Sequence, residues 1–493
     1  MLGPASEAPQ NTDMQINDRQ NTKIVATVGP ACIERDMLRA LIEEGVDIFR
    51  LNFSHGSHEV HAGTIANIDA LNAELGTHVG ILADLQGPKL RVGRMAGDGL
   101  SLEEGDIVTF TNEERVGDMD GVYMSYPEFA RDVNVGERVL VDDGKLVFQV
   151  VSTDGVSKVR LKALYAGTLK DNKGVNLPNT KISLPSLTAK DEADLEYILA
   201  HHPTVNWIAL SFVRSAKDVK ELRARIEAAG HQAKVISKIE KPEAVERIDK
   251  IIKASNAVMV ARGDLGIEIP MEQLPIVQKM IVRKCIQRAR PVIVATQMMD
   301  SMIENPSPTR AEITDVANAV LDGTDAVMLS GETSVGRHPI KVVEAMNKII
   351  EQAEKVYDFN GRRPKPNEKS SIFRSDVVCI NAARVATEIN AKAICGLTVS
   401  GYTAFKISSY RAANVKTYIF SEKNHILGAL NLVWGVRGFH YDKFTTTDDT
   451  IEDTTNILKA KGLVKEGDLL VNTGSMPLHR RFTTNMMKVT EVE

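Results

Sequence analysis

The stretch VGILADLQGPKLR, residues 79–91, decides the fold, because it joins a buried strand to a segment of another type. The apolar run at 79–83 ends at Asp84, a pattern typical of a strand in a parallel sheet. Gly87 and Pro88 then predict a turn. Strand and helix patterns alternate before this turn, whereas short alternating segments rich in glycine follow it. We therefore interpret 79–91 as the point where a β/α fold is interrupted by an inserted domain.

Eight strand-like runs surround this insertion. KIVATVG, VDIFRLN and VGILADL precede it, with helical patterns around residues 33–44 and 58–76. NWIALSF, KVISKIE, NAVMVAR, PVIVATQ and DAVMLSG follow it, each with a helical stretch behind it. Eight such units predict a closed (β/α)₈ barrel, the TIM barrel. A doubly wound open sheet is the alternative, and the number of regular units disfavours it.

Four parts of the α/β chain follow from these patterns. Residues 1–20 are polar and predict a disordered tail. The barrel is expected at 21–87 and 186–358, with an inserted β-barrel lid domain at 88–185. The segment FNGRRPKPNEKS indicates a linker to a C-terminal α/β regulatory domain at 359–493.

Composition excludes several classes of function. The 493 residues carry a formal net charge of -5 and contain no long basic run, which argues against nucleic-acid and membrane-surface partners. No apolar run approaches the ~20 residues of a membrane helix, and the N-terminus lacks the features of a signal peptide. The four cysteines are isolated, without metal-ligand spacing, and favour a reducing, cytoplasmic location.

Polar residues stand where six of the eight strands end. Because barrel enzymes carry their chemistry at the carboxyl ends of the strands, these side chains are expected at one rim. They are Arg50, Asn52 and Ser54; Asp84; Lys238 and Glu240; Arg262 and Asp264; Thr296; and Ser330 and Glu332.

Two carboxylates at this rim predict a divalent-ion site. Lys238 and Glu240 lie two residues apart and so point to the same face of a strand. Alone they favour a structural ion pair, but Asp264 in ARGDLG would bring a second carboxylate beside Glu240. Two carboxylates without a nearby Cys or His suit Mg²⁺ or Mn²⁺.

Groups that bind anions are expected at the same rim. The N–H groups of Gly263 and Asp264 begin a helix, and Arg50 and Arg91 supply guanidinium groups suited to phosphate or carboxylate. Each feature alone has an ordinary alternative, a helix cap or a surface ion pair. Together they indicate metal-assisted chemistry on a small phosphorylated anion.

Two other motifs are weaker. His55 and His58 lie in FSHGSHE, and His61 follows soon after it. Because HGSH lacks a third aligned ligand, we discount a zinc site. TVSGYT, residues 398–403, has the hydroxyls and glycine of a phosphate-binding turn. Arg480 and Arg481 would either complete that pocket or be solvated.

Seven segments, in this order, resemble the pyruvate kinase family. They are NTKIVATVGP, FRLNFSHG, KGVNLP, SKIEKPEA, ARGDLGIEIP, ATQMMDSMIENPSPTRAE and LSGETSVGRHP, and the resemblance runs from about residue 21 to the end. It implies transfer of a phosphoryl group from phosphoenolpyruvate to ADP, giving pyruvate and ATP. It also implies Mg²⁺ or Mn²⁺, a cytoplasmic location and a homotetramer.

The resemblance assigns roles to the rim residues. Arg50 is similar to the residue that grips the transferring phosphoryl group, Lys238 to the one that stabilises its charge, and Thr296 to one near the carbon that is later protonated. The substrate site implied comprises Arg50, Gly263, Asp264, Thr296, Arg262 and Ser330, and the divalent-ion ligands Glu240 and Asp264. The nucleotide contacts implied are Pro30, Asn52, His55, Arg91 and Lys173.

The segment after Asp84 resembles the potassium-independent branch of the family. Asn52, Ser54 and Asp84 match the potassium ligands. Where the potassium-requiring branch continues Thr-Lys-Gly-Pro-Glu, this chain reads LQGPK, residues 85–89. The resemblance implies that the Lys89 ammonium replaces K⁺, because a tethered cation avoids the entropy cost of capturing an ion. The alternative is a solvated lysine at the hinge.

The C-terminal domain resembles the family's effector domain. Thr398, Ser400, Gly401 and Thr403 match its phosphate loop, which implies control by a phosphorylated effector, either a sugar phosphate or a nucleotide. The segment SMPLHRRFTTN replaces the glycine-rich loop of many relatives.

Two other functions compete with this interpretation. Another barrel enzyme, such as an aldolase or lyase, would not need the inserted domain, and a non-catalytic sensor should have lost Lys238 or a metal ligand.

Overall fold

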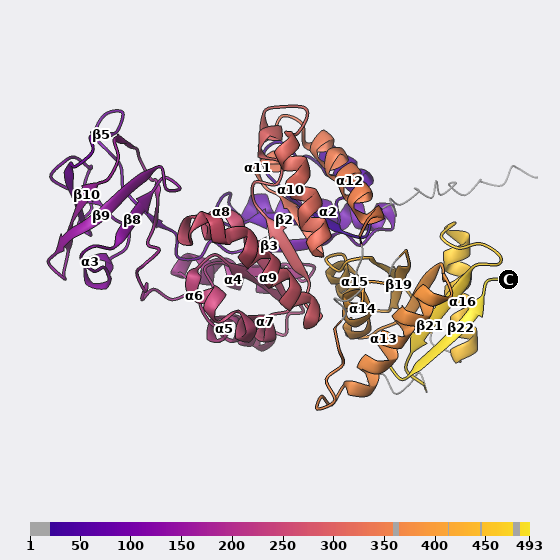
Figure 1. Cartoon of the computed structure of the whole chain (residues 1–493). Coiled ribbons are helices and arrows are strands. Elements are labelled where there is room, and N and C mark those ends of the chain that lie inside the picture. The colour runs from indigo at the N-terminus through magenta and orange to yellow at the C-terminus, as the bar shows by residue number, and fades with distance from the viewer. Residues whose placement is uncertain (1–19, 358–363, 413, 444–445, 477–483) are drawn as a thin grey trace, which may run out of the picture.

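The computed structural model describes residues 20–357, 364–412, 414–443, 446–476 and 484–493. Three domains lie in a row, with the inserted domain at one end, the barrel in the centre and the C-terminal domain at the other end (Figure 1). Gln20, which the sequence places in the tail, is buried, and its carbonyl accepts from Lys416 Nζ at 3.2 Å. The rest of the predicted tail, 1–19, lies outside the described residues.

The barrel is closed by eight parallel strands, which confirms the (β/α)₈ prediction over the open sheet. Their order around the barrel is β1-β17-β16-β15-β14-β13-β3-β2. The strands are β1 (Lys23–Thr27), β2 (Ile48–Asn52), β3 (Gly80–Asp84), β13 (Trp207–Leu210), β14 (Lys234–Ile239), β15 (Ala257–Ala261), β16 (Val292–Ala295) and β17 (Ala326–Leu329).

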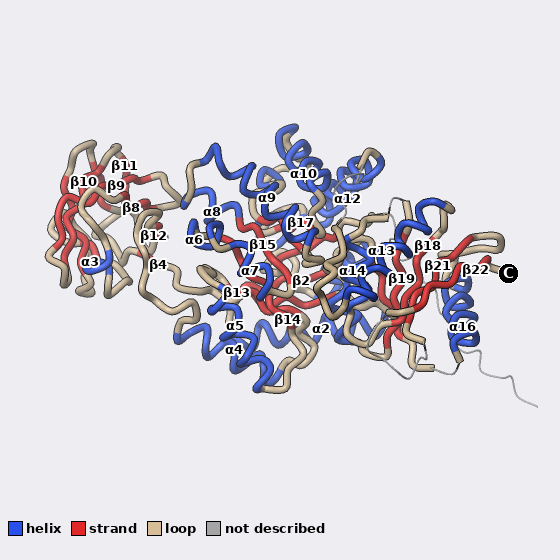
Figure 2. The backbone as a smooth tube through the Cα atoms, turned by 60° about the horizontal axis from the view of Figure 1, so that its bottom comes forward, coloured by secondary structure: helices blue, strands red, loops and turns tan. Residues whose placement is uncertain are grey.

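Helices cover the outer face of these strands (Figure 2). They are α1 (Arg35–Glu44), α2 (His58–Leu75), α4 (Ala189–His201), α5 (Ala216–Ala228), α6 (Pro242–Glu246), α7 (Ile248–Ala254), α8 (Arg262–Glu268), α9 (Leu274–Gln287), α10 (Arg310–Asp322), α11 (Gly331–Ser334) and α12 (Pro339–Lys355), with short 3-10 turns at Met271–Gln273 and Asp300–Ile303. Capping boxes at Thr188, Ser215 and Thr309 fix where α4, α5 and α10 begin.

The segment KPEAVERIDKII forms two helices rather than the one helix that its apolar spacing predicts. Pro242 occupies the first turn of α6, as expected. Arg247 then leaves helical geometry with φ -102° and ψ 15°, and α7 restarts at Ile248. Ala244, Ile248 and Ile252 are nevertheless all buried, so the break preserves the apolar face.

The inserted domain is a small β-barrel. A seven-stranded sheet runs in the order β4-β12-β8-β9-β10-β6-β7, and β5 pairs with β11. Its two edges are joined by a bridge between Val92 and Met124, where Gly93 N donates to Tyr123 O at 2.9 Å. The elements are β4 (Leu90–Arg91), β5 (Leu100–Leu102), β6 (Ile107–Thr111), β7 (Val122–Tyr123), α3 (Phe129–Asp132), β8 (Arg138–Val141), β9 (Leu146–Thr153), β10 (Lys158–Ala163), β11 (Gly167–Leu169) and β12 (Gly174–Asn176).

The first connection to this lid domain turns at Gly87. Its φ of +70° lies in the left-handed region, and a Cβ there would come within 2.8 Å of Ser211 and Phe212. Its N–H donates to Asp191 Oδ1 at 3.0 Å, and Ser211 Oγ donates to Leu85 O at 2.7 Å. Only glycine fits this turn without displacing the neighbouring loop.

The C-terminal domain is a five-stranded sheet with the order β20-β19-β18-β21-β22. The runs AKAICGLTVSG, VKTYIFS, WGVRGFH and GDLLVNTG predict four strands here, and all four are present. The antiparallel strand β22 was not predicted. Its elements are α13 (Phe373–Glu388), β18 (Ala393–Leu397), α14 (Tyr402–Ser409), β19 (Lys416–Ser421), α15 (Asn424–Leu430), β20 (Val436–His440), α16 (Thr447–Ala460), β21 (Leu469–Gly474) and β22 (Met486–Glu491). Among all the described helices, none is both long and apolar enough to cross a membrane.

Candidate active site at the barrel rim

Arg50, Asp84 and Lys238 meet at the carboxyl ends of β2, β3 and β14. Arg50 Nε donates to Asp84 Oδ2 at 2.6 Å, and its Nη1 donates to Thr27 Oγ1 at 3.0 Å. Lys238 Nζ lies 3.3 Å from Asp84 Oδ1. Burial alone would raise the pKa of Asp84, but the charges of Lys238 and Arg50 outweigh it and hold the pKa below its ordinary value. Asp84 is therefore an anion that fixes two cations at the rim.

Lys238 is also held by Glu240 and Ser211. Its Nζ lies 3.0 Å from Glu240 Oε1 and donates to Ser211 Oγ at 2.8 Å. Burial lowers the pKa of Lys238, but the carboxylates of Asp84 and Glu240 more than compensate, so its pKa lies above the ordinary value. The side chain is only 13% exposed. The rim thus presents a permanent, oriented positive charge.

The turn after β16 brings Thr296 against the start of α8. Thr296 and Gln297 both have positive φ, 71° and 52°, which is rare for a β-branched residue such as threonine. Thr296 Oγ1 accepts from Gly263 N at 2.8 Å. Strained backbone of this kind concentrates at functional sites, where it fixes the position of a group.

Arg262, which is predicted to bind substrate, contacts the turn after β16 and helix α10. Its Nη1 donates to Asp315 Oδ1 at 2.7 Å and its Nη2 to Thr296 O at 2.8 Å. These contacts suit a residue that holds the Thr296 turn in place.

Two residues after β17 complete this side of the rim. Ser330 Oγ is buried and has no hydrogen-bond partner among the described residues. The carboxylate of Glu332 accepts from Ser330 N at 2.6 Å and from Met299 N at 3.2 Å, which ties the turns after β16 and β17 together.

Glu240 and Asp264 have the chemistry to hold a divalent ion. Burial raises the pKa of Glu240, Lys238 opposes that shift, and the nearby charge of Asp264 adds to it. A cation between the two carboxylates would relieve this like-charge repulsion, and Mg²⁺ is commonly bound by one or two carboxylates together with water and substrate phosphates. In the described part of the chain no three His, Cys, Asp or Glu side chains gather as a metal site.

The two lid cations predicted to bind the nucleotide, Arg91 and Lys173, are held by contacts within the lid. Arg91 Nη1 donates to Asn172 O at 2.9 Å. Lys173 Nζ lies 2.9 Å from Asp142 Oδ1, and this contact lowers the pKa of Asp142. In this arrangement neither cation contacts the rim residues.

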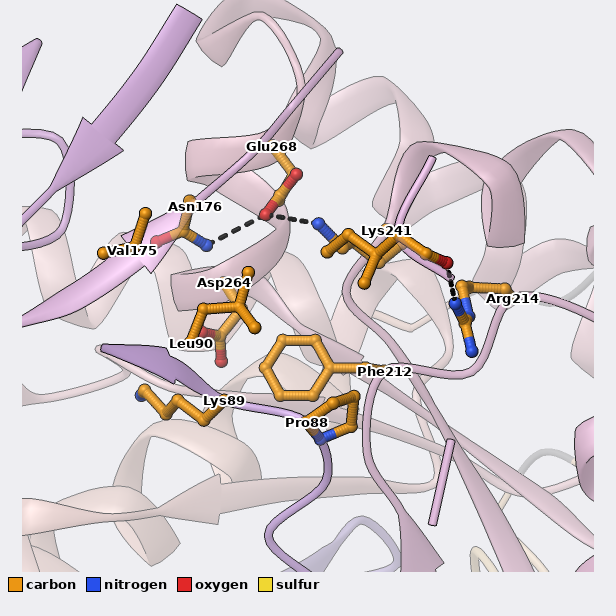
Figure 3. A pocket seen from close by; sticks show the side chains of 11 residues that line it. Pro88, Lys89, Leu90, Val175, Asn176, Phe212, Arg214, Lys241, Asp264 and Glu268 are labelled. Atoms are coloured by element: carbon orange, nitrogen blue, oxygen red, sulfur yellow. Dashed lines mark hydrogen bonds and ion pairs between the residues drawn. The ribbon is translucent and has the colours of Figure 1, made fainter. Parts of the chain in front are cut away.

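Lys89 is exposed at the junction of lid and barrel. Lys89 lines a pocket together with Pro88, Asp264 and Glu268. Lys89 and Glu268 lie on opposite sides of this pocket (Figure 3). Among the described residues Lys89 forms no ion pair, and the partners of Asp84 are Arg50 and Lys238.

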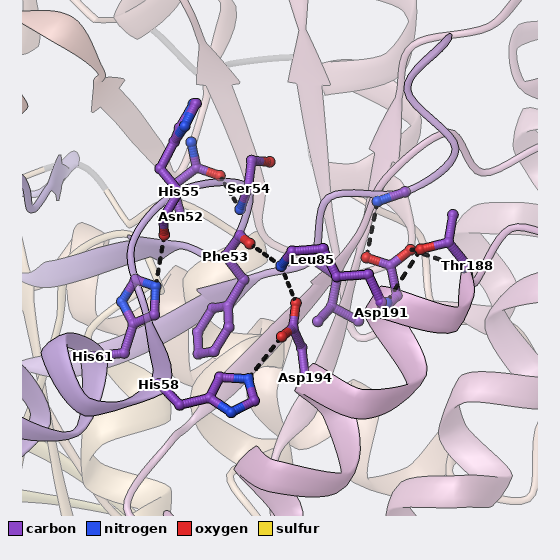
Figure 4. Close-up of polar contacts among 12 residues, drawn as sticks. Asn52, Phe53, Ser54, His55, His58, His61, Leu85, Thr188, Asp191 and Asp194 are labelled. Carbon is purple, nitrogen blue, oxygen red and sulfur yellow. Dashed lines mark hydrogen bonds and ion pairs between the residues drawn. The ribbon is translucent and has the colours of Figure 1, made fainter. Parts of the chain in front are cut away.

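Asn52 at the end of β2 and Ser54 and His55 in the loop after it belong to the predicted monovalent-ion and nucleotide sites (Figure 4). Asn52 Oδ1 accepts from Ser54 N at 3.2 Å, while His55 and Pro30 are exposed. His61 Nε2 contacts His55 O at 2.9 Å.

His58 and His61 form packing and polar contacts that hold this loop in place. His61 stacks on Phe53, with ring centroids 4.2 Å apart. His58 Nε2 lies 2.8 Å from Asp194 Oδ1, and Lys190 binds the other oxygen of the same carboxylate at 2.6 Å. These contacts anchor the loop to α4.

The predicted effector loop lies between β18 and α14. Gly401, with φ 83°, donates its N–H to Thr398 Oγ1 at 2.9 Å, and Ser400 is exposed. Thr403 Oγ1 lies 2.7 Å from Thr484 Oγ1. Arg480 and Arg481 lie outside the described residues.

Comparison with known families decides the relationship. A family model described as pyruvate kinase, barrel domain, matches residues 19–343, and one described as pyruvate kinase, alpha/beta domain, matches residues 376–490. The chain belongs to the pyruvate kinase family. It is therefore a phosphotransferase, as the resemblance implies.

Individual pyruvate kinases match along almost the whole chain. That of Corynebacterium glutamicum is 42% identical over 470 residues, which cover 95% of this chain and 97% of that protein. That of Geobacillus stearothermophilus is 40% identical and covers 96% of this chain, with 80% of its own length matched. The crystal structure of a pyruvate kinase from Cryptosporidium parvum is 34% identical, covers 97% of each chain and superposes with a TM-score of 0.90.

Several residues around the pyruvate kinase rim escaped the sequence analysis. Ser211, which follows β13, contacts Lys238, and Phe212 N donates to Glu240 Oε2 at 2.5 Å. Thr27 at the end of β1 accepts from Arg50. Ser211 and Thr27 lie at strand ends, so the same reasoning that found the other rim residues could have predicted them. No sequence pattern predicts that the backbone N–H of Phe212 donates to a carboxylate.

Proposed function

We propose that the rim transfers the phosphoryl group of phosphoenolpyruvate to ADP, producing pyruvate and ATP. The observation that carries this proposal is the buried ammonium of Lys238, oriented by Asp84 and Glu240 beside the guanidinium of Arg50. Phosphoryl transfer passes through a loose transition state that needs fixed positive charge and alignment more than covalent help. A cation whose position is set before substrate binds costs no reorganisation during the reaction.

Arg50 and Lys238 have complementary roles in this mechanism. Arg50 binds the phosphoryl oxygens through its guanidinium group, which Asp84 holds in place. Lys238 stabilises the charge on the phosphoryl group as it moves between donor and acceptor. Mg²⁺ or Mn²⁺ held by Glu240 and Asp264 would supply further neutralisation of the phosphate charge.

The substrate carboxylate is proposed to bind at the start of α8. The proposed pocket comprises Gly263, Asp264, Thr296 and Arg262, with Ser330 on the neighbouring turn. Arg262 also donates to Thr296 O. The Thr296 hydroxyl lies at the strained turn and is proposed to act near the carbon that is protonated after transfer. The unpartnered Ser330 hydroxyl is available to the same ligand.

The nucleotide is proposed to bind between rim and lid. Pro30, Asn52 and His55 form its barrel side, and the exposure of Pro30 and His55 fits that role. Arg91 and Lys173 contact its phosphates when the lid closes, exchanging their present partners within the lid.

The monovalent cation is proposed to be unnecessary. Asn52, Ser54 and Asp84 form the site that holds K⁺ in relatives, and Lys89 supplies its charge when the lid moves. The Lys89 side chain is exposed, forms no ion pair among the described residues and closely follows Asp84 in the sequence, which supports this role.

Assembly and regulation are also proposed from the family. Met271 in the 3-10 turn before α9 is 82% exposed and Ile276 in α9 is 67% exposed, and the edge strand β22 exposes Met487 and Val489. Such apolar surfaces suit contacts between subunits of a cytoplasmic homotetramer. The loop with Thr398, Ser400, Gly401 and Thr403 is proposed to bind a phosphorylated effector, a sugar phosphate or a nucleotide.

A coupled assay of pyruvate formation tests the proposal. Phosphoenolpyruvate and ADP should give pyruvate and ATP only when Mg²⁺ or Mn²⁺ is added. Pyruvate without ATP would indicate a phosphatase that hydrolyses phosphoenolpyruvate. No product with either ion would indicate an aldolase or lyase with another substrate, or a sensor protein.

A further inference from the structure

Glu268, the last residue of α8, is a buried carboxylate that connects the lid to the barrel. Its Oε1 accepts from Asn176 Nδ2 on lid strand β12 at 2.9 Å and from Lys241 Nζ at 2.8 Å (Figure 3). The side chains of Lys241 and Glu268 are 5% and 1% exposed. The other oxygen, Oε2, is also buried and has no hydrogen-bond donor among the described residues.

The three segments that meet here all carry residues of the proposed site. α8 begins with the turn that holds Asp264, and Lys241 directly follows Glu240. On the lid, Asn176 lies on β12, which pairs with β4 through Gly174 and Arg91. One carboxylate oxygen therefore links both divalent-ion ligands to the lid sheet that carries Arg91.

The two contacts of Glu268 differ in strength. The contact with Lys241 lies within the barrel and joins two buried charges, and removing one partner of such a pair is strongly unfavourable. The contact with Asn176 crosses to the lid, and its donor is a neutral amide. Movement of the lid therefore separates Asn176 from Glu268 and leaves the Lys241 pair intact.

We propose that Glu268 is a positioning residue that sets the orientation of the lid relative to the divalent-ion carboxylates. It does so by accepting from Asn176 while Lys241 fixes its own position. This inference rests on the proposed role of the lid in nucleotide binding. The lid orientation that Glu268 sets would place the ADP phosphates correctly relative to the rim residues. Loss of the Asn176 contact leaves the lid free to sample more orientations, and ADP binds less well.

Distance measurement between lid and barrel tests the contact directly. The four native cysteines are buried, so spin labels can be directed to new surface cysteines. Val135→Cys on the lid, where the native residue is 67% exposed, and Lys220→Cys on α5 give a labelled pair. Pulsed electron resonance on the full chain then reports the distribution of distances. Asn176→Ala and Asn176→Asp should both broaden this distribution.

A matched control isolates the contact from the charge change. Asn112→Asp adds the same charge to the lid at a residue whose amide contacts Pro127 O within the lid, and it should leave the distribution unchanged. A distribution for Asn176→Asp that equals that of the parent overturns the proposal.

Kinetics separate a positioning role from a purely structural one. Loss of a hydrogen bond to a carboxylate shifts an equilibrium by about tenfold, so both Asn176 variants should raise KM for ADP by about three- to tenfold. KM for phosphoenolpyruvate should stay within about twofold, because the rim is untouched. A broadened distribution with an unchanged KM for ADP also overturns the proposal. Failure of the parent to make pyruvate would refute the proposed function, while the distances would still test the contact.

Discussion

The two ends of the barrel both bury charge, but they arrange it differently. At the rim, one ammonium, that of Lys238, serves two carboxylates, Asp84 and Glu240, and Asp264 adds a third negative charge nearby. At the opposite end, which faces the C-terminal domain, Arg411 Nη2 lies 3.1 Å from Asp325 Oδ1 with both side chains almost fully buried.

We call the end of the barrel that faces the C-terminal domain the floor. The ion pair there, Arg411 with Asp325, is enclosed by residues of both domains. Trp434 N and Val292 N donate to the two oxygens of Asp325 at 3.3 and 3.0 Å. Arg411 Nη2 also donates to Gly323 O at 2.9 Å, and its guanidinium lies 4.7 Å from the ring centroid of Trp434. The difference teaches that rim charges are arranged to meet a ligand, whereas floor charges join two domains. Substitutions at the two ends should therefore affect different properties.

The largest expected effect is that of Lys238→Met at the rim. Removing one preorganised electrostatic group typically costs about 10²–10³ in rate, and Lys238 supplies the charge nearest the moving phosphoryl group, so we expect at least that loss in ATP formation. Protonation of enolpyruvate should continue, because it depends on the Thr296 side of the rim. Coupled assays of ATP formation and of enolpyruvate protonation measure the two steps.

The control for this change is Lys234→Met, at the other end of the same strand β14. It should leave the rate of ATP formation unchanged. Near-normal ATP formation by Lys238→Met would show that the role assigned to Lys238 is wrong.

The next effect is on stability, from Arg411→Met at the floor. Removing one partner of a buried ion pair leaves the other charge uncompensated and typically costs about 3–5 kcal/mol. Thermal or urea unfolding should detect this loss, while the KM for phosphoenolpyruvate of the folded variant stays the same. Arg384→Met, which breaks an exposed pair with Glu388 in the same domain, is the control and should cost little. Equal stability of the two variants would remove the distinction between the barrel ends.

Sequence patterns predicted the architecture better than the partners of each charge. The eight strands, the insertion after Asp84 and four strands of the last domain follow from local periodicity, whereas β22 has exposed, mixed residues and no such signal. Strand ends predicted the rim residues because parallel strands bring them together. The contacts of Arg262 with Thr296 O, and of Glu268 with Asn176, join distant segments through side-chain geometry, which one sequence does not encode locally.

A smaller effect is expected at Lys89, where the rim meets the lid. Without K⁺, in tetramethylammonium buffer, the parent should keep most of its activity because the ammonium supplies the monovalent charge. Lys89→Glu inverts that charge, so K⁺ should activate this variant by about tenfold. That factor corresponds to roughly 1.4 kcal/mol of activation free energy. Steady-state assays with and without KCl measure it. A many-fold K⁺ dependence of the parent would refute the idea, and Lys145→Glu, an exposed lid lysine, serves as control.

A further effect, on acid stability, is expected at the end of the barrel that faces the C-terminal domain. Burial, with a contribution from the charge of His440, lowers the pKa of His78 to about 4, and Asn431 of the C-terminal domain donates to its carbonyl. An unfolded histidine titrates near pH 6.5, so between about pH 6.5 and 4 only the unfolded chain gains this proton, and stability falls as pH falls. At pH 5 this amounts to about 2 kcal/mol, which His78→Gln should abolish.

Unfolding at pH 7 and pH 5 measures this difference. The loss between the two pH values should be smaller in His78→Gln than in the parent, and the exposed His201→Gln should behave as the parent does. Equal losses in all three proteins would mean that His78 is protonated as readily in the folded chain as in the unfolded one. Its partial burial against the C-terminal domain would then carry no electrostatic cost. The loss of stability in acid could not come from Asp325 instead, because burial raises the pKa of that carboxyl, and such a group stabilises the folded chain as pH falls.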